Sequence, residues 1–136
     1  MRRLFLDSNV LFTAGHNHSG KASLVIELGA KKHWKVLTST YAAEEARRNI
    51  ALKFPDSLPR LETLLSSVTV LPSGVGRPCP IDLPLKDRVI FGAALQGNAT
   101  HLLTGDGKHF GPLMNSPAHT CGITIQTIAE FLAAIA

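Results

Sequence analysis

The stretch that decides the fold is "LFLDSNVLF", residues 4–12, in which one acid and one amide interrupt an otherwise apolar run. Its composition is that of a buried strand, so we expect the chain to begin with a strand that has Asp7 at or near its carboxyl end. Burial of an ionised carboxylate costs several kcal/mol unless a partner compensates it. Asp7 is therefore expected to have such a partner.

Length and composition predict a globular chain. It has 136 residues, 45% of them hydrophobic and 18% charged, which predicts one domain over residues 1–136 with a substantial core. No apolar run reaches the roughly 18 residues of a membrane span and no signal peptide is recognisable, so a cytoplasmic protein without a membrane partner is expected. Cys79 and Cys121 follow no metal-ligand spacing and are expected to be free thiols. A net charge of +4 permits a polyanionic partner.

Short apolar strands alternate with helices along the chain. Strands are predicted at the start of residues 2–12 and at 34–39, 68–71 and 123–127, and residues 100–106 are predicted as a strand and the turn that follows it. Helices are predicted at about 19–28, 41–54, 57–67, 86–96 and 128–136. Ser19 is the expected cap of the first helix, Gly29 is expected in its C-terminal turn, and residues 72–84 form a loop. The alternation predicts an α/β fold, a three-layer α/β/α sandwich with a central, mainly parallel sheet.

Three aspartates occupy positions from which they can reach one edge of that sheet. Asp7 and Asp106 each close an apolar run, and ligands of parallel sheets bind beyond such strand ends. Asp87 heads a helical stripe that continues at Ile90 and Phe91, which turns it toward the core. Each also has a structural explanation: Asp7 and Asp106 as turn or helix-capping residues, and Asp87 as a first-turn acid favoured by the helix dipole.

The helix at 41–54 offers two acids, Glu44 and Glu45. At about 100° per residue, Glu44 points nearly opposite the alanine-rich buried face and is expected in solvent. Glu45 lies nearer the border of that face and is the candidate site residue. The alternative is an exposed Glu45 whose partner is Arg48 or Asn49.

Together, Asp7, Glu45, Asp87 and Asp106 predict a metal site. Converging carboxylates repel one another unless a cation neutralises them. Hard oxygen ligands suit Mg²⁺ or Mn²⁺ rather than zinc. Such ions polarise phosphoryl oxygens and activate water, which is the chemistry of phosphodiester hydrolysis. The expected partner of Asp7 is therefore a divalent cation and not a cation of the protein.

The chain resembles a PIN domain, the metal-dependent ribonuclease fold found in the toxins of many toxin–antitoxin pairs. "FLDSNVLF" (5–12) looks like the opening strand of that family, with Asp7 as the first metal-site acid and Asn9 as the companion amide. "TSTYAAEEARRNI" (38–50) resembles the second block, in which the acid follows the strand-end serine by six residues. Counting from Ser39 selects Glu45, in agreement with the helical-face argument.

The second half of the chain carries the other two blocks of that resemblance. "KDRVIFGAAL" (86–95) looks like the third block and carries Asp87. "HLLTGD" (101–106) resembles the fourth, with Thr104 and Asp106. The four blocks follow one another in the family's order at compatible spacing and cover nearly the whole chain.

The resemblance implies a PIN-like fold and a Mg²⁺- or Mn²⁺-dependent ribonuclease. The catalytic and metal-binding residues would be Asp7, Glu45, Asp87 and Asp106. Asn9 and Thr104 would orient those ligands through hydrogen bonds. The partners to expect are RNA, a small antitoxin protein that blocks the acidic groove and, in a homodimer, a second copy of the chain.

One departure from the family concerns the segment after the fourth block. Many members carry a further acid there, where this chain has Gly107, Lys108 and His109. The difference favours one tightly held ion, with a second ion recruited by the substrate phosphate. Lys108 is a candidate RNA contact that neutralises a phosphate oxygen, or else an ordinary exposed lysine.

Other function classes fit the sequence less well. "GHNHSGKAS" (15–23) has the glycine and lysine spacing of a phosphate-binding P-loop, but Ala22 stands where that motif needs Ser or Thr. A haloacid-dehalogenase-like phosphatase needs a proton donor where this chain has Asn9. His16 and His18 form an H-x-H pair that is expected in solvent. A catalytically inactive PIN-like module that binds RNA or protein stays the main alternative.

Overall fold

A computed structural model of the chain describes residues 1–73, 79–105, 107–108 and 110–136. Its sheet has the strand order β3-β2-β1-β4-β5, and every neighbouring pair is parallel. The strands are β1 (Arg3–Leu6), β2 (Lys35–Ser39), β3 (Thr69–Leu71), β4 (His101–Thr104) and β5 (Thr124–Thr127). Because all of these strands run in the same direction, their carboxyl ends meet at one edge of the sheet.

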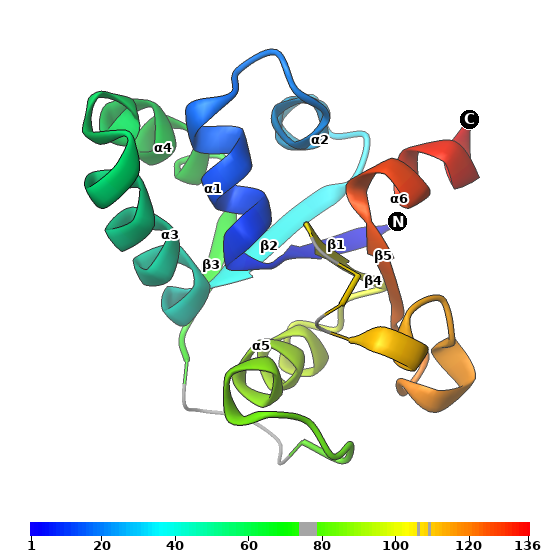
Figure 1. Cartoon of the computed structure of the whole chain (residues 1–136). Coiled ribbons are helices and arrows are strands. Elements are labelled where there is room, and N and C mark those ends of the chain that lie inside the picture. The colour runs from blue at the N-terminus through cyan, green and yellow to red at the C-terminus, as the bar shows by residue number, and fades with distance from the viewer. Residues whose placement is uncertain (74–78, 106, 109) are drawn as a thin grey trace.

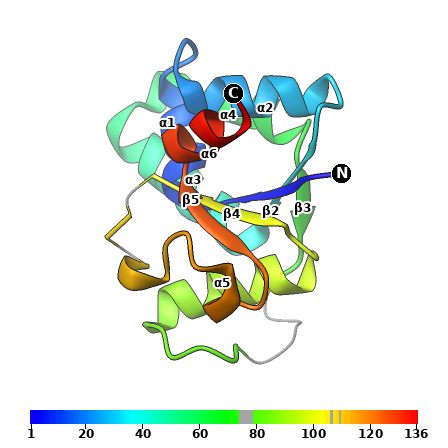
Figure 2. The same cartoon turned by 90° about the vertical axis from the view of Figure 1, so that its right-hand side faces the viewer.

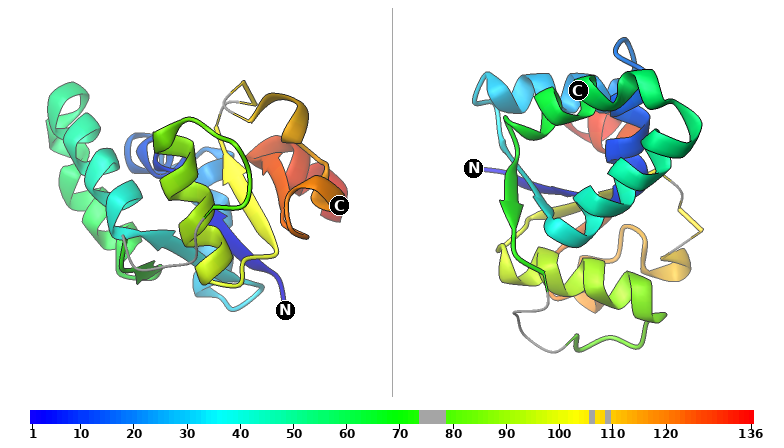
Figure 3. Two further views of the ribbon diagram at one scale, coloured as in Figure 1. Left: turned by 90° about the horizontal axis from the view of Figure 1, so that it is seen from below. Right: turned by 90° about the vertical axis from the view of Figure 1, so that its left-hand side faces the viewer.

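Helices cover both faces of this sheet (Figures 1 and 2). They are α1 (Ser8–His16), α2 (Lys21–Ala30), α3 (Thr40–Lys53), α4 (Leu58–Leu65), α5 (Leu85–Gln96) and α6 (Ile128–Ile135). Short 3-10 helices lie at Pro55–Ser57, Gly111–Leu113 and Pro117–His119. α5 lies on one face and α1, α2 and α6 on the other, while α3 and α4 pack beside α1 (Figure 3). The predicted three-layer α/β/α arrangement with a parallel sheet is confirmed.

Side chains at the ends of strands begin the helices that follow them. Asp7, directly after β1, accepts a hydrogen bond from the backbone N–H at the start of α1. Ser39 ends β2 and accepts from the backbone N–H of Ala42 at 3.2 Å. Thr127 ends β5 and forms a capping box with Glu130 in α6. Each of these strands therefore turns into a helix at the carboxyl edge of the sheet.

The core lies between the sheet and its two helical layers. Leu4 and Phe5 of β1 and Leu102 of β4 are fully buried, as are Leu11 from one helical layer and Phe91 from the other. Burying one such side chain contributes roughly 1.5–3 kcal/mol to folding. None of the described helices is long and apolar enough to cross a membrane.

The opening stretch begins as a strand that ends directly before Asp7, as predicted, and the apolar residues after Asp7 form a helix. β1 ends at Leu6, and residues 10–12 belong to α1. The cause is Asp7, whose Oδ1 accepts from the Ser8 N–H at 2.7 Å and so satisfies a backbone donor that a helix start leaves open. Within α1 the buried residues Val10 and Ala14 lie one helical turn apart.

The predicted cap and C-terminal turn of the next helix are wrong, although its bounds lie within two residues of the prediction. Gly20, not Ser19, occupies the N-cap of α2, and it supplies no side-chain hydrogen bond. Gly29 lies inside α2, where a side chain would collide with Val36 of β2, so its role is to allow close packing of helix on strand. The left-handed conformation after the helix belongs to Lys32, with φ 68°.

Two further expectations concern the loop at 72–84 and the cysteines. Residues 74–78 of that loop lie outside the described ranges. Cys79 and Cys121 are free thiols, as predicted. The single domain over residues 1–136 stays a prediction.

Candidate functional site

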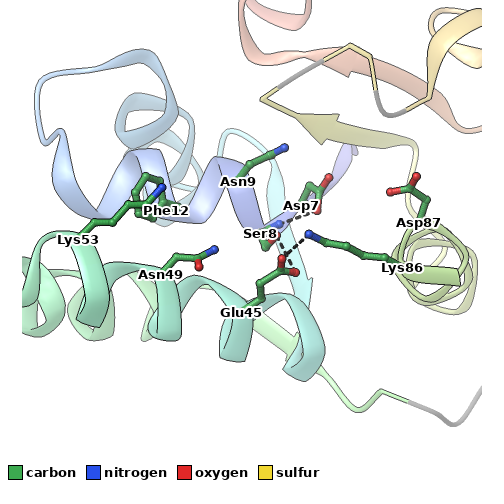
Figure 4. Close-up of a pocket in the computed structure, with 9 residues that line it drawn as sticks. All are labelled: Asp7, Ser8, Asn9, Phe12, Glu45, Asn49, Lys53, Lys86 and Asp87. Carbon is green, nitrogen blue, oxygen red and sulfur yellow. Dashed lines mark hydrogen bonds and ion pairs between the residues drawn. The ribbon is translucent and has the colours of Figure 1, made fainter. Parts of the chain in front are cut away.

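The side chains of Asp7, Glu45 and Asp87 line one pocket at the carboxyl edge of the sheet (Figure 4). Asp7 follows β1, Glu45 projects from α3, and Asp87 comes from the first turn of α5. The pocket has a volume of about 140 Å³. The structure therefore brings these three acids together from distant parts of the sequence, as expected from their positions at strand and helix ends.

Asp7 is almost completely buried and accepts hydrogen bonds on both carboxylate oxygens. Its side chain is 4% exposed. Oδ1 accepts from the backbone N–H of Ser8 at 2.7 Å, and Oδ2 accepts from the hydroxyl of Thr104 at 3.2 Å. The helix-capping explanation of Asp7 is thus correct, and it does not compete with a place in the pocket because one side chain does both.

Asn9 connects the first turn of α1 to the end of β4. Its Oδ1 accepts from the backbone N–H of Gly105 at 2.7 Å, and its Nδ2 donates to the Thr104 hydroxyl at 3.3 Å. Because Thr104 in turn donates to Asp7, these bonds form a chain that fixes the orientation of the Asp7 carboxylate. The hydrogen bonds expected of Asn9 and Thr104 are present, while the part of both residues in activity stays a prediction.

The two adjacent glutamates of α3 point in different directions. The Glu44 side chain is 60% exposed and pairs with Arg47 at 2.8 Å, one turn along the helix. The Glu45 side chain is 15% exposed and enters the pocket, where it accepts from the Ser8 hydroxyl at 3.2 Å. The helical-face argument therefore assigned the orientation of both side chains correctly.

A protein cation enters the pocket, which the sequence analysis did not foresee. The Lys86 ammonium forms an ion pair with Glu45 (Figure 4). The hydrogen bond to Glu45 is the main cause that raises the pKa of Lys86 above its ordinary value, and the negative charge of Asp7 adds to the effect. Lys86 pairs with Glu45 and places a positive charge near Asp7, while a divalent cation as the partner of Asp7 stays a prediction.

Asp87 is buried although it lies in the first turn of a helix. The helix dipole favours an acid at this position, yet it would do so equally on the solvent face. Asp87 is instead buried, together with Ile90 and Phe91 on the same stripe of α5. The predicted stripe is confirmed, and it directs the carboxylate into the pocket.

The fourth predicted acid, Asp106, lies outside the described residues, and so does His109. Lys108 lies in an exposed turn that follows β4. The roles of Asp106 as a metal ligand and of Lys108 as an RNA contact stay predictions.

The donor set of the pocket suits a hard divalent ion, since Mg²⁺ and Mn²⁺ prefer carboxylate oxygens. Within the described ranges, however, no group of three or more His, Cys, Asp and Glu side chains has the arrangement of a metal site. That search does not include Asp106. The Lys86 ammonium already neutralises Glu45, so an ion that uses this carboxylate has to compete with Lys86.

The pocket contains residues that the sequence analysis did not select as site residues: Ser8, Phe12, Asn49, Lys53 and Lys86. A lysine beside Asp87 at the start of a helix opposes the helix dipole, and this was an available signal. The other signal was a spacing of four residues. Asn49 and Lys53 follow Glu45 at this spacing along α3, and Phe12 follows Ser8 at the same spacing along α1, which places each set of side chains on one helix face.

The rival motif at residues 15–23 forms the end of α1, a turn and the start of α2. His18 is exposed, as expected. His16 is only partly exposed and stacks on Phe54, with ring centroids 4.4 Å apart, so the prediction of a fully solvated pair is wrong for this residue. The stack forms because α1 and the end of α3 lie side by side, which the motif itself does not reveal.

The chain is similar to known proteins in its three-dimensional structure. No family model matches the chain, and no curated protein gives a significant match. Among solved structures, VapBC2 from Rickettsia felis, bound to a DNA fragment from its promoter, matches with a TM-score of 0.66. That chain is 17% identical, and the match covers 92% of the present chain and 98% of the other.

Two further solved structures extend this similarity. DNA-bound VapBC from Salmonella typhimurium matches with a TM-score of 0.65 and 16% identity, over 94% of this chain and 99% of the other. VapC20 from Mycobacterium tuberculosis, a toxin that cleaves the sarcin–ricin loop, matches with a TM-score of 0.54 and 13% identity, over 79% and 92%. At these identities the likeness concerns the fold, and it confirms the PIN-like fold predicted from the sequence.

Proposed function

We propose that this chain, which has the fold of the VapC toxins, is a divalent-metal-dependent ribonuclease that hydrolyses RNA phosphodiester bonds. The observation that carries the proposal is the meeting of Asp7, Glu45 and Asp87 in one pocket at the carboxyl edge of a parallel sheet. These three carboxylates outnumber the two lysines that line the same pocket, so a divalent ion is the partner that we expect to neutralise the remaining negative charge. The net charge of +4 is compatible with RNA as the partner.

The carboxylates of Asp7, Glu45 and Asp87, with Asp106 from the segment after β4, would hold a Mg²⁺ or Mn²⁺ ion. When bound, such an ion supplies polarisation of the phosphoryl group and activation of water. Asn9 and Thr104 hold the Asp7 carboxylate in a fixed orientation, since the Thr104 hydroxyl donates to it. Ser8 does the same for Glu45 through its hydroxyl.

Lys86 would have two partners in turn. Without an ion, its ammonium neutralises Glu45. Once displaced from that carboxylate, it carries a positive charge beside the pocket and can stabilise the charge that develops on a reacting phosphate. The long, flexible side chain of lysine suits such a change of partner.

The biological setting that we propose is a toxin–antitoxin pair. The similar structures include VapBC complexes and a toxin that cleaves an RNA loop. By this analogy, the chain would be the toxin, and a small antitoxin protein would silence it by covering the acidic pocket.

Cleavage of an unstructured RNA oligonucleotide tests the ribonuclease proposal. We expect cleavage in Mn²⁺ or Mg²⁺, its complete loss in EDTA, and a loss of about 100-fold or more in Asp87→Asn. Cleavage that survives both EDTA and this substitution would come from another source and would contradict the proposal.

The second candidate function is a PIN-like module that binds RNA or protein without turnover. Two observations favour it: the ion pair of Lys86 with Glu45, and the lack of an acid at Gly107 and Lys108. RNA binding without cleavage in either metal would support this alternative over the ribonuclease.

A further inference from the structure

A groove between α1 and α3 leads away from the acids. On each helix a stripe of side chains at intervals of four residues faces it, which places each stripe on one helix face. These residues are Ser8 and Phe12 on α1 and Glu45, Asn49 and Lys53 on α3, and His16 continues the α1 stripe one turn beyond the groove. The stripes run side by side: the Ser8 hydroxyl meets Glu45 at 3.2 Å at one end, and the Lys53 ammonium lies 5.5 Å from the centre of the Phe12 ring at the other.

The groove and the acids belong to one pocket. Phe12, Asn49 and Lys53 line the same cavity as Asp7 and Glu45 (Figure 4). Along the groove, the lining groups change from carboxylates to the amide of Asn49, and then to the Phe12 ring and the Lys53 ammonium. A ligand that fills this pocket therefore contacts an amide, a cation and an aromatic ring as well as the acids.

The Phe12 ring at the far end of the groove adjoins two further aromatic rings, those of His16 and Phe54, which lie beside the residues that line the pocket. The Phe12 ring lies 4.8 Å from that of His16 and 5.8 Å from that of Phe54, and His16 stacks on Phe54 at 4.4 Å. Phe54 is 42% exposed, and Phe12 and His16 are only partly buried. Aromatic rings beside a basic side chain are the elements with which proteins bind single-stranded nucleic acid, because every base has a face that can stack.

We propose that this ring surface, formed by Phe12, His16 and Phe54, stacks an unpaired base of the RNA strand near the cleaved phosphate. Lys53 then pairs with a backbone phosphate, and the Asn49 amide hydrogen-bonds to the same strand. Asp7 is the N-cap of α1 and Phe12 lies five residues further along, or about 7.5 Å along the helix axis, so the stacked base belongs to a nucleotide close to the acids. The inference rests on the proposed function, since it takes RNA as the ligand of the pocket.

RNA fits this groove better than a protein segment does. An apolar segment would need an apolar surface, whereas here the rings adjoin an ammonium and an amide and continue into carboxylates. Stacking also requires the base to be unpaired, so the substrate class is single-stranded RNA or a loop.

The test uses a short unstructured RNA that carries one 2-aminopurine, whose fluorescence falls when it stacks. Affinity and fluorescence are measured in EDTA, so that no cleavage occurs. We expect Phe54→Ala and Phe12→Leu to weaken binding by about 5- to 100-fold and to reduce the quenching of fluorescence. Leu52→Ala is the matched control, because Leu52 is an exposed apolar residue at the end of α3, two positions before Phe54, and does not line the pocket.

Salt dependence tests Lys53 separately. Loss of one phosphate contact in Lys53→Met should reduce the slope of log affinity against log salt concentration by about 0.7. Arg48→Met, on an exposed position of α3 outside the pocket, should lower the slope by less.

Because Phe54 is exposed, Phe54→Ala should fold even if Phe12→Leu does not, and it then tests the inference by itself. Unchanged affinity and quenching in Phe54→Ala would overturn the inference and leave a protein segment as the occupant of the ring surface. If the wild type cleaves RNA but these variants bind it normally, the proposed function stands and the inference fails. If the variants bind RNA more weakly but the wild type never cleaves RNA, the RNA-binding surface is supported and the proposed ribonuclease activity is contradicted.

Discussion

The Lys86 ammonium forms an ion pair with the Glu45 carboxylate, inside the pocket that also contains Asp7 and Asp87. The chain itself thus supplies a positive charge to the acids it gathers. Any divalent ion that binds Glu45 competes with a lysine adjacent in sequence to another acid of the pocket. The affinity for metal should therefore depend on a residue that is not itself a ligand.

Lys86→Met should strengthen binding of Mn²⁺. The substitution removes the competing ammonium, and because Lys86 is about half exposed the pair is worth about 1 kcal/mol, which corresponds to roughly fivefold in affinity. The half-saturating Mn²⁺ concentration is read from melting temperatures over a metal titration. Lys31→Met, at an exposed position after α2, is the control. Weaker Mn²⁺ binding in Lys86→Met would show that the lysine supports the metal site instead.

Divalent ions should stabilise the folded chain, and Asp87→Asn should remove most of this gain. An ion that binds only the folded state at a hundredfold excess over its Kd adds about 2.7 kcal/mol, which raises the melting temperature by roughly 5–10 °C. Asp82→Asn, an exposed acid in the loop before α5, should keep the full shift. An equal shift in the wild type and in Asp87→Asn would argue against a shared site.

Glu45→Gln and Glu44→Gln should differ sharply in RNA cleavage. Glu45 lies in the pocket, so loss of its charge should lower the rate by about 100-fold or more. Glu44 is exposed and pairs with Arg47, so its loss should change the rate by less than about threefold. Circular dichroism shows whether both variants fold. The opposite ranking would move the functional acid to Glu44.

Thr104→Val should weaken metal binding and lower the rate of cleavage, each by about 10- to 100-fold. The valine side chain has nearly the same shape as that of threonine, so the loss would come from the missing hydroxyl. The fully buried Thr104 hydroxyl donates to Asp7, and valine removes that donor. Thr104→Ser keeps the hydroxyl and should retain most of the affinity for Mn²⁺. Equal losses in both variants would mean that packing, not the hydrogen bond, is what Thr104 contributes.

Mild acid should destabilise the fold in part through His101. Burial is the main cause that lowers the pKa of His101 below its ordinary value of 6.5. The unfolded chain therefore takes up this proton at a higher pH than the folded chain does. The contribution of neutral His101 is complete above about pH 6.5 and is lost as the pH falls through its folded-state pKa.

Urea unfolding at pH 7 and at pH 5.5 measures this effect. The fall in the free energy of unfolding between the two should be smaller in His101→Gln than in the wild type. His18→Gln, at an exposed position, should follow the wild type. A fall of the same size in His101→Gln would assign the acid sensitivity to other groups.

Local patterns predicted most of the secondary structure. The strands at β2, β4 and β5 and the helices at α3, α5 and α6 lie within one or two residues of their predicted ends. The direction of Glu45 followed from helical geometry alone, since the alanine face of α3 decides which acid turns inward. The start of α1 could not be read in the same way, because a short apolar run suits a strand and a buried helix equally.

The sequence by itself determined a parallel α/β fold and the acids that reach the edge of its sheet. Both depend on periodicity and on the order of elements, which are local properties of the chain. Only the tertiary structure decided that Lys86 pairs with Glu45, and that Phe12 and His16 on α1 meet Phe54 after α3. These contacts join residues about 40 positions apart, and their geometry depends on how helices pack against one another, which no local pattern records.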